Sequence, residues 1–468
     1  MFKRRSYFKS KSPYRSSYFS KRKKRNAPPL GAILLSLPLI LIFLEILARV
    51  ALGISGEGGG LASNRGEPAI VTAYRLKFLS RDRQPLTGLG DGGELAAYRN
   101  LSVGYKLAPS QKHPYWQINE QGFRDEEPVP LAKPNGEVRV FVLGNSVAFG
   151  AGSLSNEATI SSKLETRLQQ RIAQQQGSPQ KYRPDTLSFY KPERDKSLAL
   201  PPKIRPGTYR AIDAAVPGYT SGNHLAQLAL EILPYQPDAI VVLGGYTDLM
   251  LPADKTATTI PKLERFLSDP SRHYWASLSQ SARQWAANLA LSRMVGSWTS
   301  ESQASLEART LGIWDEDKPL AQHLAADDEE LERRIQRYRE NYKQLIQLCA
   351  GAGIPLVLAL QPEITGRSAE VMVEQEKEIV EQLGQDYQQR VQTGYEKLAR
   401  AHDQLKKAYP NNVYIYNFYR LYEKTPDRVF EDPIHLTEAA NEELAKRLYD
   451  GLTSVPKMQV IPKNAVVK

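Results

Sequence analysis

The sequence predicts a three-layer α/β/α domain with a five-stranded parallel sheet, preceded by one N-terminal transmembrane helix. Two observations predict this fold class. Short apolar runs rich in β-branched residues alternate with stretches of helical periodicity over residues 137–455. Most of the runs end in glycine or polar residues. Strands that alternate with helices favour a parallel sheet covered by helices on both faces.

The first 28 residues form a basic tail. They hold 11 Lys and Arg and no Asp or Glu. Removing these 11 from the 62 basic residues leaves 51, which equals the 51 acidic residues, so the rest of the chain is neutral. The tail has no apolar periodicity, and we expect it to be disordered. Because the excess charge lies in the tail, we do not expect the folded body to bind nucleic acid.

Residues 29–54 are expected to cross the membrane. Residues 27–44 carry no charge, and the apolar stretch continues to about Ile54, interrupted by Glu45 and Arg49. A helix over residues 30–54 would be about 37 Å long, enough to span a bilayer with some tilt. A cleaved signal peptide is the alternative, but the long basic region before it favours a retained anchor. The basic tail is then cytoplasmic, and everything after about residue 55 lies outside the cytoplasm.

The remaining elements follow in order. Residues 55–136 begin with a Gly-rich linker and continue as an irregular lead-in with a few short strands. Helices are expected at 157–175, 221–233, 328–350 and 436–452. The five apolar runs predicted as strands are 138–143, 209–216, 238–243, 354–360 and 413–418.

Three segments interrupt this scheme as insertions. Residues 176–208 are polar and Pro-rich and predict a surface excursion. Residues 251–327 hold four of the five Trp, and their stretch 282–298 has an apolar side, so we expect this segment to roof the active site. Residues 368–408 repeat apolar positions at helical spacing and predict one long helix. Residues 456–468 form a C-terminal tail.

Chemically active residues follow the predicted strands. Ser146 follows the first strand, Gly218 the second and Thr247 the third. Asp432 and His435 lie between the fifth strand and the last helix. The carboxyl ends of parallel strands share one edge of a sheet, where such folds bind ligands. We therefore expect these five residues to converge.

Together they can form an acyl-transfer site. Ser146 would be the nucleophile, His435 the general base, and Asp432 would orient the imidazole. The N–H groups of Ser146 and Gly218 and the hydroxyl of Thr247 could form an oxyanion hole. A Ser after a strand or a lone Asp-x-x-His is often only structural, but their joint occurrence favours catalysis. No metal-ligand spacing and no phosphate-binding loop is found, so neither a metal nor a cofactor is expected.

These motifs resemble the sequence blocks of the SGNH (GDSL-like) hydrolases. VFVLGNSVAFGAG contains Ser146, AAVPGYTSGN contains Gly218, GYTD contains Thr247, and DPIH runs from Asp432 to His435. NEQGFR, from Asn119 to Arg124, resembles a lead-in found in membrane-anchored members. The resemblance implies a flavodoxin-like fold and the Ser146–His435–Asp432 triad. Thr247 stands where the family has Asn, and Asn145 where it has Asp.

The function that this reading predicts is a serine ester hydrolase acting outside the cytoplasmic membrane on an acyl ester, such as a lipid or an acylated glycan. One alternative is an acyltransferase that modifies a cell-envelope glycan with the same triad. Another is a binding or assembly module that is catalytically weak or inactive. The residues do not distinguish hydrolysis from transfer, and they do not identify the substrate or the oligomeric state.

Overall fold

The computed structural model describes residues 68–80, 82–86, 93–260, 263, 310 and 318–463. The predicted basic tail and the predicted membrane helix at 29–54 therefore lie outside the described residues. Within the described residues, none of the helices combines the length and apolar character needed to cross a bilayer.

The central sheet has five strands, all parallel, as predicted. The three central strands are almost wholly buried between helices on both sides of the sheet, whereas the edge strand at Val413–Asn417 is mostly half-buried. Every predicted run forms one of these strands, although the strand predicted at 209–216 ends three residues earlier than expected, at Asp213. In sheet order the strands are β10 (Val413–Asn417), β9 (Leu356–Leu360), β8 (Ala239–Gly244), β6 (Glu137–Gly144) and β7 (Thr208–Asp213).

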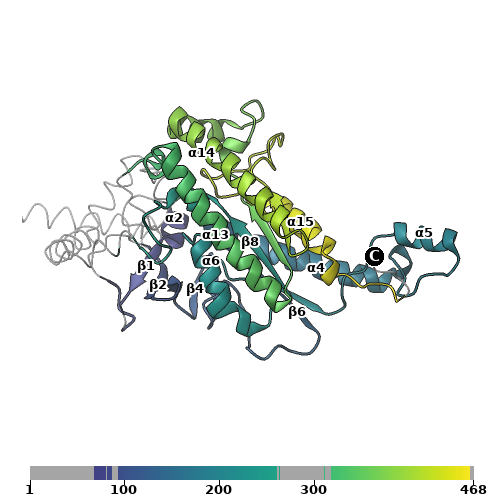
Figure 1. Ribbon diagram of the computed structural model, residues 1–468. Coiled ribbons are helices and arrows are strands. Elements are labelled where there is room, and N and C mark those ends of the chain that lie inside the picture. The colour runs from purple at the N-terminus through teal and green to yellow at the C-terminus, as the bar shows by residue number, and fades with distance from the viewer. Residues whose placement is uncertain are drawn as a thin grey trace, which may run out of the picture.

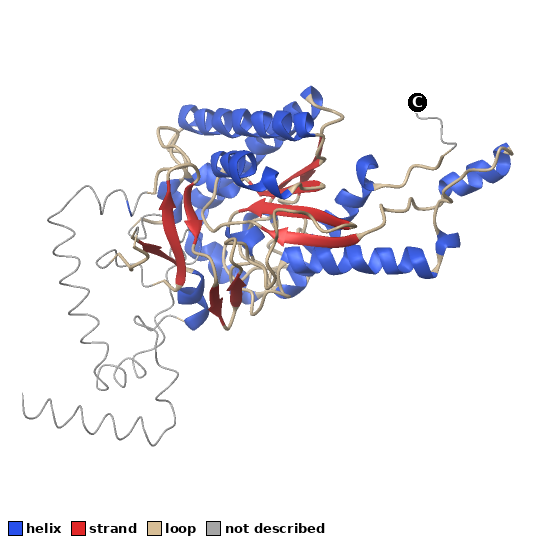
Figure 2. Ribbon diagram, turned by 90° about the horizontal axis from the view of Figure 1, so that it is seen from below, coloured by secondary structure: helices blue, strands red, loops and turns tan. Residues whose placement is uncertain are grey.

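Helices cover both faces of this sheet (Figures 1 and 2). One layer is formed by α4 (Ile160–Gly177) and α15 (Glu438–Ser454), which pack together. The other is formed by α6 (Ser221–Gln227), α13 (Asp328–Ala352) and α14 (Glu374–Ala408). Short helices follow β6 and β8, namely α3 (Ser146–Phe149) and α7 (Tyr246–Met250), and α12 (Leu320–His323) precedes α13.

Two predicted helices depart from regular α-helix. The helix expected at 221–233 is α-helical only to Gln227 and continues as a π-turn over Leu228–Ile232. A 3-10 turn at Leu233–Tyr235 follows, where Pro234 removes a backbone donor. The long helix predicted at 368–408 is interrupted at Gly384, whose φ of 75° lies in the left-handed region. The interruption corrects the prediction of one continuous helix.

The lead-in folds against the main domain. It begins with α2 (Ala69–Tyr74) and contains a three-stranded sheet and a two-stranded hairpin. In the first sheet β2 pairs parallel with β1 and antiparallel with β3. The strands are β1 (Leu76–Leu79), β2 (Leu95–Asn100), β3 (Gly104–Leu107), β4 (Gln111–His113) and β5 (Trp116–Ile118).

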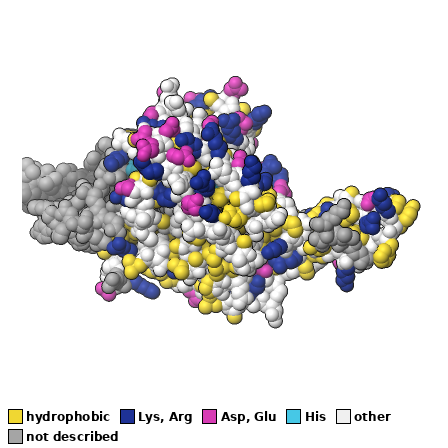
Figure 3. Space-filling view, viewed as in Figure 1, with side chains coloured by type: hydrophobic (Ala, Val, Ile, Leu, Met, Phe, Trp, Pro, Cys, Tyr) yellow, Lys and Arg dark blue, Asp and Glu magenta, His cyan; other side chains and the backbone are white. Residues whose placement is uncertain are grey.

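The segment 176–208 projects away from the body as an arm (Figures 1 and 2). It contains a 3-10 turn at Pro179–Lys181 and the helix α5 (Lys191–Ala199). Some of its hydrophobic side chains are exposed beside basic ones, and Phe189 is 90% exposed (Figure 3). The arm is therefore a surface excursion, as the sequence predicts.

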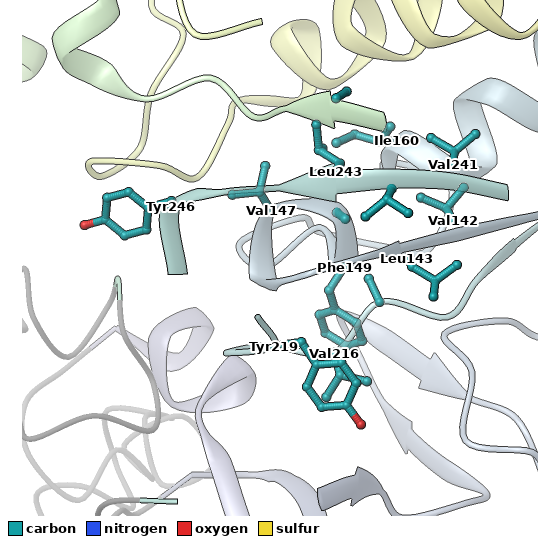
Figure 4. Packing of buried hydrophobic residues seen from close by; sticks show 14 of the residues in the cluster. Val142, Leu143, Val147, Phe149, Ile160, Val216, Tyr219, Val241, Leu243 and Tyr246 are labelled. Atoms are coloured by element: carbon teal, nitrogen blue, oxygen red, sulfur yellow. The ribbon is translucent and has the colours of Figure 1, made fainter. Parts of the chain in front are cut away.

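Packing in the core fixes the start of the segment that carries Ser146. Val147 and Phe149 of α3 are buried beside Leu143 of β6 and Leu243 of β8 (Figure 4). Gly144, the last residue of β6, leaves no room for a side chain, because a Cβ there would lie 2.4 Å from both the Leu243 carbonyl oxygen and the Ala148 Cβ. Only glycine fits this position, and the turn it allows brings Ser146 to the edge of the sheet.

Candidate active site

Ser146 is the first residue of α3. The side chain of Asn145 caps this helix by accepting a hydrogen bond from the Val147 N–H at 3.1 Å, and Gly150 ends it in the left-handed conformation. The Asn145 amide also donates to Gln361 Oε1 at 2.6 Å. Asn145 is thus held from two sides, which fixes the backbone of the neighbouring Ser146.

Asp432 and His435 form a hydrogen-bonded pair in the loop before α15. His435 Nδ1 lies 2.6 Å from Asp432 Oδ2, and the backbone N–H groups of Ile434 and His435 donate to Asp432 Oδ1 at 3.0 and 2.8 Å. Burial alone would raise the pKa of Asp432. The charge of His435 and these hydrogen bonds outweigh it and hold the pKa below its ordinary value. An ionised Asp432 accepts the Nδ1 proton, which leaves a lone pair on Nε2.

The Nε2 atom of His435 is buried, and it has no hydrogen-bond partner among the described residues. His435 and Ser146 line one cavity of about 430 Å³. Asp432 and Gly218 line it as well. The structure thus brings together four of the five residues that the sequence predicted.

Gly218 occupies the third position of a tight turn after β7. The Tyr219 N–H donates to the Val216 carbonyl at 3.1 Å, Pro217 is the second residue, and Gly218 has a φ of 84°. This is the pattern of a type II turn, which favours glycine at that position. The turn places the Gly218 backbone at the cavity wall beside Ser146.

Thr247 does not join the other four. Its hydroxyl donates to the Tyr219 carbonyl at 2.6 Å, and it is not among the residues that line the cavity. A hydroxyl has one proton, so this bond leaves none for an oxyanion. The arrangement does not support Thr247 as an oxyanion donor. Thr247 instead ties α7 to the turn that carries Gly218.

The sequence reading missed several cavity residues. Ile70, Val71 and Tyr74 of the lead-in helix α2 form one wall, and the exposed Leu154 lies after α3. The sequence gave no signal for α2, because the NEQGFR motif lies well after it in the lead-in and indicates no partner there. Arg428 and Glu431 form an ion pair at 2.6 Å and also line the cavity.

The segment expected to roof the site is only partly described. Thr310 is buried and lines the cavity. The apolar stretch 282–298 lies outside the described residues, so its predicted position stays a prediction. In the described part of the chain, no three His, Cys, Asp or Glu side chains are arranged to hold a metal ion.

Comparison with known proteins gives a family and similar structures. Residues 308–448 match the GDSL-like Lipase/Acylhydrolase family, a segment that includes Asp432 and His435. No curated protein matches the sequence. A lipase/acylhydrolase from Enterococcus faecalis is 13% identical, with 70% of this chain and 100% of that chain covered and a TM-score of 0.35.

Two further solved structures are similar at the same level. The psychrotrophic esterase EstA from a Pseudoalteromonas species is 11% identical, with coverage of 68% and 97% and a TM-score of 0.31. An acetylxylan esterase from Geobacillus stearothermophilus is 11% identical, with coverage of 69% and 96% and a TM-score of 0.31. The match over residues 308–448 indicates a GDSL-like lipase/acylhydrolase domain in this part of the chain, which supports an ester-bond hydrolase.

Proposed function

We propose that this chain is a serine ester hydrolase that acts outside the cytoplasmic membrane through Ser146, His435 and Asp432. The observation that carries this proposal is the His435 imidazole. Its Nδ1 is engaged by Asp432, and its Nε2 is unpartnered among the described residues, in the cavity that Ser146 also lines. A general base for a serine hydroxyl needs a free Nε2 lone pair and a carboxylate on Nδ1, and His435 offers both in the cavity that it shares with Ser146.

The reaction has two steps. His435 Nε2 takes the Ser146 proton as Ser146 Oγ attacks the ester carbonyl, and the protonated imidazole then gives this proton to the departing alcohol. An acyl-enzyme remains on Ser146. Water, deprotonated by His435, attacks this second ester and releases the acid and the free serine. The backbone N–H groups of Ser146 and Gly218 are the proposed donors to the tetrahedral oxyanion.

The cavity lining supports an ester with an apolar acyl group. Ile70, Val71 and Leu154 give it an apolar side, whereas Arg428 and Glu431 give it a charged one. Binding sites are commonly apolar with a few polar groups that fix orientation. A lipid or an acylated glycan fits this combination.

Labelling with a fluorophosphonate tests the proposal, because this probe reacts only with an activated serine. We expect the full chain to be labelled and Ser146→Ala to be unlabelled. Ser153 provides a matched control, since it lines the same cavity and is 7% exposed, as is Ser146. Ser153→Ala should be labelled like the unaltered chain. A folded chain that neither labels nor cleaves any short aryl ester contradicts the proposal and favours the binding-module alternative.

The location is tested separately. The basic tail before residues 29–54 supports a cytoplasmic N-terminus and an external catalytic domain. A reporter that works only outside the cytoplasm should be active when fused after Lys468. Activity of a cytoplasmic reporter at that position would contradict this topology.

A further inference from the structure

Arg124 lies in the lead-in, yet its guanidinium contacts the segment that carries the nucleophile. It is 4% exposed. Its Nη1 donates to the carbonyls of Phe149 and Gly150, at 2.7 and 2.8 Å. Its Nε donates to Asn156 Oδ1 at 3.0 Å, and its Nη2 donates to the Ser155 carbonyl at 3.1 Å. One side chain therefore holds both the end of α3 and the loop that follows it.

The same guanidinium holds the cavity wall formed by α2. Nη2 donates to the Tyr74 hydroxyl at 2.8 Å and to the Tyr115 carbonyl at 2.9 Å. The Tyr74 hydroxyl in turn donates to the Ser153 carbonyl at 2.5 Å. Tyr74 and Ser153 both line the cavity. Arg124 thus links α2 to the segment that carries Ser146, and both segments contribute to the cavity wall.

The position of Arg124 is itself fixed by the main sheet. Its backbone N–H donates to the carbonyl of Asp213, the last residue of β7, at 3.0 Å. By contrast, α3 has only four residues, and a helix of one turn is not stable without outside contacts. The guanidinium supplies such contacts at the end of α3 opposite to Ser146.

We propose that Arg124 is a positioning residue for the reaction. It fixes the C-terminal end of α3, and with it Ser146 at the start, and it docks α2 as a wall of the cavity. This inference rests on the proposed function of Ser146. A guanidinium suits the task because its five N–H donors lie in one rigid plane and can serve several carbonyls at once, whereas the lysine ammonium is a compact group on a flexible stem.

The first test measures catalysis in Arg124→Ala and Arg124→Lys at temperatures well below unfolding. We expect kcat for p-nitrophenyl acetate and the rate of fluorophosphonate labelling to fall about 10- to 100-fold in Arg124→Ala, because small displacements of a nucleophile cost this much. KM for this small ester should change little. Arg124→Lys should recover only part of the rate.

Arg139 provides the control. It is also buried, and it lies near the start of β6, roughly 20 Å from Ser146 at about 3.3 Å per residue. Its Nη1 donates to the Tyr235 carbonyl at 2.8 Å. Arg139→Ala should lower the Tm but keep kcat. If Arg124→Ala lowers the Tm and keeps kcat in the same way, Arg124 is only structural and the proposal is wrong.

A second readout does not depend on activity. Amide hydrogen exchange should become faster over residues 147–156 and 69–74 in Arg124→Ala, and it should not change there in Arg139→Ala. Unchanged exchange in Arg124→Ala overturns the positioning role. If the unaltered chain fails to label, the proposed function fails, and the exchange result still decides whether Arg124 positions α3. Where Arg124→Ala does not fold, Tyr74→Phe removes the hydroxyl that joins Arg124 to the Ser153 carbonyl and should show faster exchange over residues 69–74. Unchanged exchange there overturns the docking of α2.

Discussion

Two regions of the molecule use buried histidines in opposite ways. In the candidate active site, His435 pairs with the carboxylate of Asp432 and lines a cavity. On the helix α13, the hydroxyl of Tyr338 lies 2.6 Å from His402 Nε2. Neighbouring Tyr342 lies 3.1 Å from His224 Nδ1, and the rings of these two tyrosines are in edge contact. We call His224, His402, Tyr338 and Tyr342 the tyrosine–histidine cluster.

All three histidines are buried, so burial does not distinguish them. The two regions differ in the hydrogen-bond partner of the imidazole and in its access to the cavity. Burial lowers the pKa of His402 to about 3 and that of His224 to about 4, so both are neutral at physiological pH. Neither lines the cavity. Of these three, only His435 combines a carboxylate partner, which would stabilise an imidazolium during a proton transfer, with a position on the cavity wall. Burial alone therefore does not mark a catalytic histidine.

The largest expected effect separates the two regions directly. His435→Ala should lower kcat about 10⁶-fold, and adding Ser146→Ala should cost little more, because triad residues act as a unit. His402→Ala should keep kcat near that of the unaltered chain while lowering the free energy of unfolding. Steady-state kinetics on an aryl ester and urea unfolding measure both. A large loss of kcat in folded His402→Ala would contradict the distinction.

The next effect concerns the carboxylate itself. Asp432→Asn keeps the shape of the loop but replaces the acceptor of the His435 Nδ1 proton. We expect kcat to fall about 10⁴-fold, because the amide favours the wrong imidazole tautomer. The neutral amide of Asn441, which donates to the Ala158 carbonyl at 3.3 Å, offers a control away from the cavity lining. Asn441→Ala should leave kcat unchanged, and an active Asp432→Asn would remove Asp432 from the triad.

The sequence predicted the parts of the molecule that depend on local pattern. All five strands could be predicted, because each is a short run rich in apolar and β-branched residues, and the α/β/α fold with a five-stranded parallel sheet is confirmed. The convergence of Ser146, Gly218, Asp432 and His435 followed from the rule for the edges of parallel sheets. These predictions needed no knowledge of side-chain contacts between distant segments.

The parts that could not be predicted depend on such contacts. The Thr247 hydroxyl donates to a carbonyl 28 residues away in sequence, and nothing in GYTD indicates this partner. Arg124 contacts α2 and the α3 segment at once, although the motif NEQGFR suggested only a lead-in. The left-handed Gly384 interrupts α14 within an otherwise regular helical pattern. In each case the tertiary environment decided between outcomes that the local sequence allowed equally.

Substitution of Thr247 should have a smaller effect on kcat, and it tests whether Thr247 contributes to the oxyanion hole. Thr247→Val removes the donor to the Tyr219 carbonyl and leaves that buried oxygen without its hydrogen bond. The free energy of unfolding should fall by about 1–3 kcal/mol. The kcat should fall less than the 10²–10³-fold loss that follows removal of an oxyanion donor. A kcat loss of that size in a folded variant would restore Thr247 to the oxyanion hole.

The smallest effect tests the tyrosine–histidine cluster through pH. The folded chain holds His402 neutral down to a pKa of about 3, whereas a histidine in the unfolded chain titrates near 6.5. As the pH falls below about 6.5, the unfolded chain binds a proton that the folded chain excludes, and stability is lost until the pH reaches the folded pKa. His402→Gln keeps a polar partner for the Tyr338 hydroxyl but does not titrate.

The quantity to compare is therefore the loss of unfolding free energy between pH 7 and pH 5, in the unaltered chain and in His402→Gln. The unaltered chain should lose more, by at most about 1.4 kcal/mol per pH unit for one proton. His435→Gln would not serve as the comparison, because it also removes the partner of the Asp432 carboxylate. Equal losses in the two proteins would mean that His402 is protonated in the folded chain as easily as in the unfolded one, and that its burial beside Tyr338 does not keep it neutral.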